Sequence, residues 1–154
     1  MQGLEGDWLY QRIVDDSPEA IVVADPEGRI RFWNRAAEEI FGYRQAEALG
    51  EMLDVIVPEP QRARHWAGYR AVMQSGQTRY GRDLLAVPAI RKDGARISVE
   101  FYVVLLRDDA GQVAGIAALI RDVTARWQRD RALQQRLRAL EAASGQRPLD
   151  DAER

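Results

Sequence analysis

The stretch IRKDGARISVEFYVVLL, residues 90–106, decides the fold class of this chain. Its Asp93-Gly94 pair is a strong signal for a tight turn between two antiparallel strands. Beyond the turn, apolar and polar side chains alternate at a period of two, which is the pattern of a strand with one buried face. The apolar positions are Ile97, Val99, Phe101, Val103 and Leu105. The stretch therefore predicts a β-hairpin.

Further strands are predicted on both sides of this hairpin. Residues 107–123 contain the turn RDDAGQ followed by VAGIAALIRDV, which predicts a third strand. The extended segment 79–91 supplies the first strand of the hairpin, and its Pro88 favours an edge or bulged position. Nearer the N-terminus, AIVVAD at 20–25 and IRFWN at 30–34 flank a Pro/Gly turn and predict a second hairpin. Together these segments can form a five-stranded antiparallel sheet.

Helical patterns precede, interrupt and follow the strands. Residues 4–14 have the spacing of an amphipathic helix, and a longer helix is predicted from Pro60 to about Gln74, with Gly76 just past its end. The order of elements predicts an α+β fold, with helices over one face of the sheet and a flanking helix at each terminus. We divide the chain into an N-terminal flanking helix (1–15), a central domain (16–123), a C-terminal helix (124–143) and a flexible tail (144–154).

The composition excludes several classes of protein. The 154 residues are 46% hydrophobic, enough for one globular domain, and the absence of cysteine excludes disulfides and thiolate chemistry. With one histidine, a zinc site built from protein side chains alone is not expected. The 22 basic and 24 acidic residues form no concentrated basic face, so we expect no nucleic-acid partner. No membrane-length apolar run, leader segment or catalytic fingerprint occurs, so we expect a cytoplasmic protein without enzymatic activity or a membrane partner.

Several separated motifs occur in the order found in one known family. They are DPEGRI at 25–30, NRAAE at 34–38, FGY at 41–43, Glu47 with Gly50, RKDG at 91–94 and IRDVT at 120–124. Over residues 13–126 the chain resembles a PAS domain. The resemblance implies that residues 16–123 form a sensor domain with the PAS fold and that the helix at 124–143 passes its signal onward.

A shorter string carries a narrower resemblance. PEPQRARH, residues 58–65, is similar to the start of the helix that bears the proximal heme ligand in heme-binding PAS sensors of the FixL type. An alignment without gaps places His65 on the axial ligand, which implies heme b as cofactor and His65 as its metal ligand. The further cofactor-binding candidates are Tyr69, Arg79 (at a propionate-contacting position), Tyr80, Leu85, Phe101 and Val103.

Two alternatives stay open at these positions. In the ungapped alignment, the arginine that steadies bound oxygen in the family falls on Leu85, whereas a gap of three residues puts Arg82 there. For His65, the alternative to iron ligation is a half-buried helix histidine that binds no cofactor. Its position one turn before Tyr69, at the edge of an apolar stripe, is compatible with both interpretations.

The resulting hypothesis is a heme-binding sensor of a diatomic gas (O2, CO or NO) or of redox state. We expect a homodimer that pairs through the flanking helices, because Leu133, Leu137 and Leu140 resemble a short coiled-coil seam. The effector is expected in a partner protein or in a region outside this chain. The alternatives are a heme-free module for dimerisation or protein contact, and a pocket for a flavin or a small metabolite. The missing cysteine excludes a flavin–cysteine adduct but not a flavin held without a covalent bond.

Overall fold

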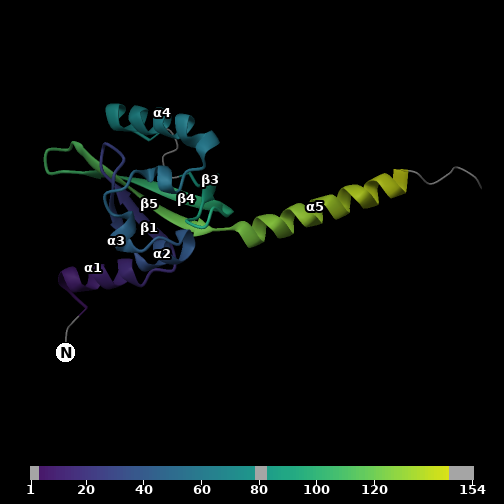
Figure 1. Ribbon diagram of the computed structural model, residues 1–154, viewed down its shortest axis with the longest axis horizontal. Helices are drawn as coiled ribbons and strands as arrows, with labels where there is room; N and C mark the ends of the chain where they lie inside the picture. The colour runs from purple at the N-terminus through teal and green to yellow at the C-terminus, as the bar shows by residue number, and fades with distance from the viewer. Residues whose placement is uncertain (1–3, 79–82, 146–154) are drawn as a thin grey trace, which may run out of the picture. The chain divides into compact units, whose positions relative to one another are not determined.

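A computed structural model describes residues 4–78 and 83–145 of the chain (Figure 1). Its elements are α1 (Gly6–Asp15), β1 (Ala20–Ala24), β2 (Ile30–Trp33), α2 (Arg35–Phe41), α3 (Gln45–Ala48), the 3-10 turn η1 (Leu53–Val55), α4 (Glu59–Ser75), β3 (Leu85–Ile90), β4 (Arg96–Arg107), β5 (Val113–Asp122) and α5 (Thr124–Gly145). The chain divides into two compact units, one up to Asp122 and one from Val123 onward.

The first unit is built on the predicted five-stranded sheet. The strands are ordered β2-β1-β5-β4-β3 and every neighbouring pair is antiparallel, which confirms the fold class expected from the strand patterns. Pro88 lies in β3, which forms one edge of the sheet as its proline predicted. β3 begins only at Leu85, and the start of the predicted strand, residues 79–82, lies outside the described residues.

The register of the strands defines one inward face of the sheet. Ala20, Val22 and Ala24 of β1 are at most 3% exposed. Opposite them on β5 lie Ile120, Ala118 and Ile116, and those three pair in turn with Phe101, Val103 and Leu105 of β4. The core forms where this face packs against α2, α3 and α4, which contribute Phe41, Ala48 and Tyr69.

A buried asparagine joins the first hairpin to the helices. Asn34 is 2% exposed and caps α2, because its Oδ1 accepts a hydrogen bond from the N–H of Ala37. The same oxygen accepts from the N–H of Ile21, while Nδ2 donates to the carbonyls of Val14 and Glu19. Four backbone groups that no regular element pairs are thus satisfied by one side chain.

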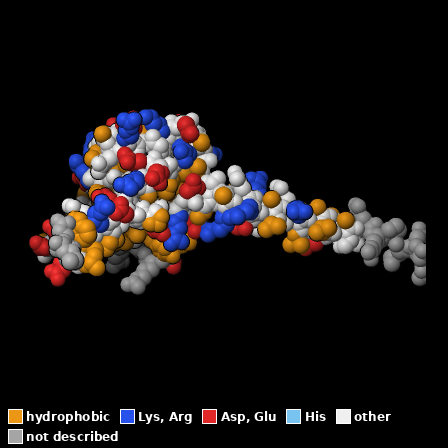
Figure 2. All heavy atoms as spheres, turned by 90° about the horizontal axis from the view of Figure 1, so that it is seen from below, with side chains coloured by type: hydrophobic (Ala, Val, Ile, Leu, Met, Phe, Trp, Pro, Cys, Tyr) orange, Lys and Arg blue, Asp and Glu red, His pale blue; other side chains and the backbone are white. Residues whose placement is uncertain are grey.

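Both flanking helices expose apolar side chains. Ahead of and within α1, the exposed large hydrophobic residues are Leu4, Trp8, Tyr10 and Ile13. The face in Figure 2 carries α1 and shows hydrophobic side chains gathered at its surface. α5 extends two residues beyond the predicted end at 143, and its Leu133, Leu137 and Leu140 are all more than half exposed. None of the described helices combines the length and apolar character needed to cross a bilayer.

Candidate functional site

The candidate site is built around the histidine of α4. This helix begins after Pro58, has a proline in its first turn, and ends at Gly76, whose φ of 66° lies in the left-handed region. His65 and Tyr69 are one turn apart and therefore lie on the same side of the helix, with ring centroids 5.8 Å apart. The Trp66 ring lies edge-on to the His65 ring at 4.9 Å. The imidazole is half-buried in this aromatic group.

One ring nitrogen of His65 lacks a partner. Nδ1 is buried and accepts or donates no hydrogen bond in the described parts of the chain. Burial lowers the pKa of His65, and the negative charge of Asp54 only partly opposes this effect. A neutral imidazole is the form that binds metals, and a buried nitrogen without a partner costs free energy that coordination would recover. These properties suit a ligand to iron.

Two neighbours of His65 fasten α4 to the first hairpin. Trp66 Nε1 donates to Asp54 Oδ1 at 2.7 Å, and the indole ring packs over Gly28. A Cβ on Gly28 would lie 2.2 Å from that ring, and its φ of +89° also requires glycine. The Tyr69 hydroxyl donates to the Asp25 carbonyl, and burial raises the pKa of this phenol. The hydroxyl of Tyr69 therefore serves to position α4, while its ring faces His65.

The apolar candidates lie together on the inward face of the sheet. Leu85 of β3 is the direct cross-strand partner of Phe101 of β4, and Val103 follows two residues later on the same face. All three are half-buried. The two remaining candidates, Arg79 and Tyr80, lie outside the described residues, as does Arg82. The choice between Leu85 and Arg82 as the residue facing a bound gas therefore stays open.

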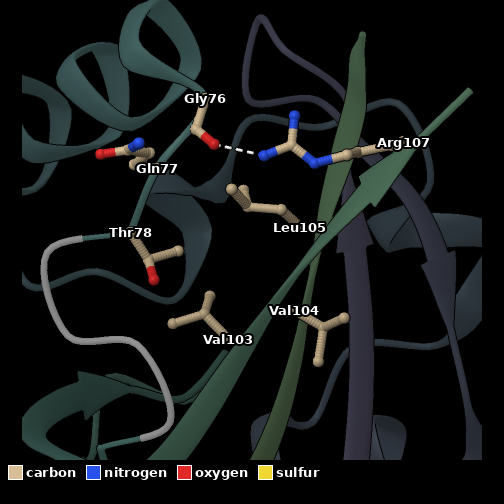
Figure 3. Close-up of a pocket in the computed structure, with 7 residues that line it drawn as sticks. All are labelled: Gly76, Gln77, Thr78, Val103, Val104, Leu105 and Arg107. Atoms are coloured by element: carbon tan, nitrogen blue, oxygen red, sulfur yellow. Dashed lines mark hydrogen bonds between the residues drawn. The ribbon is translucent and has the colours of Figure 1, made fainter. Parts of the chain in front are cut away.

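A hollow of about 600 Å³ lies between the C-terminal end of α4 and β4 (Figure 3). The residues around it are Gly76, Gln77, Thr78, Val103, Val104, Leu105 and Arg107. Its volume is within the range of about 300–1,000 Å³ that is typical of small-molecule sites. Of the seven candidate residues, Val103 lines it. A second, smaller hollow lies beside Gly42 and Arg91–Asp93, away from these candidates.

The set of metal-binding side chains in the described residues suits a cofactor that brings most of its own metal ligands. Within residues 4–78 and 83–145, no group of three or more His, Asp or Glu side chains could hold a metal ion. His65 can supply one ligand, and a porphyrin supplies four more to its iron. The side chains that would line such a ligand, Leu85, Phe101 and Val103, are apolar.

The sequence did not identify two residues of this region. Asp54 lies in an irregular segment, so no periodicity marked it as a neighbour of Trp66 and His65. Arg107 was assigned to the turn after β4, although the period of two that joins Phe101, Val103 and Leu105 continues to it. The structure places its side chain beside the hollow.

Comparison with known proteins agrees with this architecture. The family model described as the PAS fold matches residues 14–128. The chain therefore belongs to the PAS family, a class of sensory domains.

Three of the proteins that are similar to this chain are named as sensors or receptors. The Sensor protein FixL of Bradyrhizobium diazoefficiens is 29% identical over 126 residues, which cover 80% of this chain and 24% of that protein. The Oxygen sensor protein DosP of Escherichia coli is 23% identical over 120 residues, 70% of this chain and 15% of that protein. A solved RNA-binding Light-Oxygen-Voltage receptor is 27% identical with a TM-score of 0.69, and the match covers 88% of this chain and 39% of the receptor. The chain thus spans a small part of each, as a sensory domain similar to those in signalling proteins.

Proposed function

We propose that this PAS domain binds heme b through His65 and senses O2, CO, NO or the redox state of the iron. The observation that carries the proposal is the buried Nδ1 of His65, which has no partner in the described structure, on the helix where heme-binding PAS sensors carry their ligand. The similarity to a protein named as an oxygen sensor supports the same function.

The residues of the site have distinct tasks in this proposal. When bound, the heme supplies an iron that takes up a diatomic gas or changes its oxidation state. His65 holds the iron as a neutral ligand, and the bonds of Trp66 and Tyr69 to Asp54 and Asp25 keep its helix in place. Leu85, Phe101 and Val103 would supply apolar side chains that exclude water from the bound group. These three side chains would offer a diatomic gas no hydrogen-bond donor, so any donor would have to come from another residue.

The signal leaves through the strand next to the site. Val103 pairs with Ala118 of β5, and β5 leads directly into α5, which begins at Thr124. A shift of the sheet on ligand binding would favour one of two packings of α5, which is the kind of bistable element that sensors use. The receiver of this signal is an effector region or partner protein, and a homodimer forms through the flanking helices.

An absorption spectrum after heme reconstitution tests the proposal. We expect a sharp Soret band in the wild-type protein and its loss in His65→Ala. Arg64→Ala is the matched control, because Arg64 is the preceding residue of α4 and is exposed. It should retain the full band. Complete heme loading of His65→Ala, or no specific band in the wild type, contradicts the proposal.

The second candidate function is a pocket for a flavin or another small metabolite. The likeness to a Light-Oxygen-Voltage receptor, at 27% identity, favours it as the alternative. Reconstitution with flavin mononucleotide tests it directly, and the absence of cysteine restricts any photochemistry to one without a cysteine adduct. A protein that takes up neither heme nor flavin and still associates would be a PAS interaction module.

A further inference from the structure

The hollow beside β4 has an apolar floor. Val103 and Leu105 point toward the Gly76–Thr78 segment, whereas Val104 points away from it (Figure 3). Val103 and Leu105 belong to the inward face of the sheet, but they are only half-buried. Their partners on β5, Ala118 and Ile116, are also half-buried. In β1 the residues of the same face are almost fully buried. Apolar surface is therefore left partly uncovered where the hollow adjoins the inward face.

The rim of the hollow carries a positive charge that is hydrogen-bonded to neutral carbonyl groups in the described parts of the chain. Arg107, the last residue of β4, donates through Nη2 to the Gly76 carbonyl (Figure 3). Its Nη1 donates to the Gly111 carbonyl at 3.2 Å. Among the described residues, no carboxylate forms an ion pair with it. The adjacent Asp108 instead accepts the N–H groups of Ala110 and Gln112. A guanidinium has five N–H donors, and the hydrogen bonds to Gly76 and Gly111 use two of them, so Arg107 has further N–H groups that can bind a ligand.

We propose that this hollow binds an apolar ligand with a carboxylate group and that Arg107 pairs with the carboxylate. The planar fork of arginine matches a carboxylate with two parallel hydrogen bonds, and Val103 and Leu105 provide the surface for the apolar part. Two sources offer this chemistry, namely a propionate of heme and the carboxylate of a free aliphatic acid. The heme source rests on the function proposed above, whereas the aliphatic source does not.

Ligands that differ only in the acidic group separate charge recognition from apolar binding. The experiment compares wild type with Arg107→Gln and with the control Arg96→Gln. Each protein is titrated with hemin and with hemin dimethyl ester, and binding is followed by absorbance. Each is also titrated with decanoate and with decanol, and binding is followed by tryptophan fluorescence. Arg96 is the matched control because it lies at the opposite end of β4, with Nη2 3.5 Å from Gln61 of α4. Arg107→Lys, which keeps the charge but loses the fork, is titrated as a second variant. Thermal unfolding of each variant verifies that the fold is retained.

We expect Arg107→Gln to weaken binding of at least one acid about tenfold, with ester or alcohol binding unchanged. Arg107→Lys should fall between wild type and Arg107→Gln, and Arg96→Gln should match wild type. If Arg107→Gln weakens hemin binding, the carboxylate at the site is a heme propionate. If it weakens decanoate binding, the carboxylate is that of a free aliphatic acid. The inference is overturned if Arg107→Gln weakens binding of an acid and of its neutral counterpart equally, or weakens binding of neither acid. It is also overturned if wild type binds neither acid. If Arg107→Gln weakens binding of neither acid while hemin binding still depends on His65, the inference is overturned and the proposed function stands.

Discussion

At the residue scale, Asp25 shows how one side chain both fixes a turn and titrates. Its Oδ1 accepts the N–H groups of Glu27 and Arg29, and its Oδ2 pairs with Arg31 Nε at 2.7 Å. Desolvation by burial raises the pKa of Asp25, but the bonds to Arg29, Arg31 and Glu27 together outweigh it and hold the pKa below its usual value. Asp25 therefore stabilises the folded state above its ordinary pKa of 3.8, and this stabilisation is lost as the pH falls through the lower folded value.

The substitution Asp25→Ala should thus destabilise the protein in a pH-dependent way. We expect a loss of about 1–2 kcal/mol at neutral pH in urea unfolding, because half-exposed hydrogen bonds and ion pairs contribute modestly. The difference from wild type should shrink below about pH 4, where the unfolded carboxyl is protonated. Asp25→Asn, which keeps an acceptor without the charge, is the control, and the difference between Asp25→Asn and Asp25→Ala should stay constant over this range, because neither side chain titrates. A constant difference between wild type and Asp25→Ala would exclude the charge as the cause.

Residue types alone could predict some of the site but not its contacts. The motif around His65 identified the one residue whose buried nitrogen lacks a partner in the described structure. The apolar stripe on α4 included Trp66 and Tyr69, yet nothing in their spacing indicated bonds to Asp54 and Asp25. These contacts join segments far apart in the chain, and periodicity within one element carries no information about its partners.

At the scale of elements, Asn34 is the junction between the first hairpin and the helices that follow. The sequence predicted it as the residue that ends the hairpin and precedes a short helix. The structure adds two bonds from its amide to the carbonyls of Val14 and Glu19, which a cap alone would not require. A helix cap of this kind contributes about 1 kcal/mol, and each further buried group left without a partner costs about 1–3 kcal/mol.

We therefore expect Asn34→Ala to destabilise the domain by about 3 kcal/mol or more in urea unfolding. Glu38→Ala is the comparison, because Glu38 also accepts a backbone N–H, from Gln45, but at the surface. Its cost should stay below about 1 kcal/mol. Similar losses for the two variants would show that the additional bonds of Asn34 contribute nothing beyond a surface cap.

Element boundaries were predictable where local chemistry sets them. The proline at the start of α4 and Gly76 at its end marked that helix to within a residue, because both act through backbone geometry. In the first strand of the second hairpin, predicted from 79, the described residues Asp83 and Leu84 lie outside β3, which begins at Leu85, and residues 79–82 lie outside the described part of the chain. Pairing with β4 sets this boundary, because Leu85 is the first described residue of the segment that pairs with β4, opposite Phe101, and pairing between strands cannot be derived from the composition of one strand.

At the scale of the whole molecule, the exposed apolar faces of α1 and α5 bear on assembly. Trp8, Tyr10 and Ile13 of α1 and the three leucines of α5 are exposed, in helices that carry no buried residue. Monomers rarely expose apolar side chains in such numbers on one element, so a second copy of the chain is the simplest partner for them. The spacing of Leu133, Leu137 and Leu140 fits the seam of a two-stranded coiled coil.

Replacing Leu133, Leu137 and Leu140 together by serine should therefore disrupt the proposed homodimer. Each buried leucine contributes about 1.5–3 kcal/mol, so the dissociation constant measured by sedimentation should rise at least about a hundredfold. The control replaces the α5 residues Gln134, Gln135 and Arg138 by serine, which matches the loss of helix propensity while keeping the leucines. An unchanged sedimentation profile for the leucine variant, or a monomeric wild type, rejects pairing through α5. Because the leucines are remote in sequence from His65, both variants should keep the wild-type Soret band, which separates a failure of assembly from a failure of heme binding.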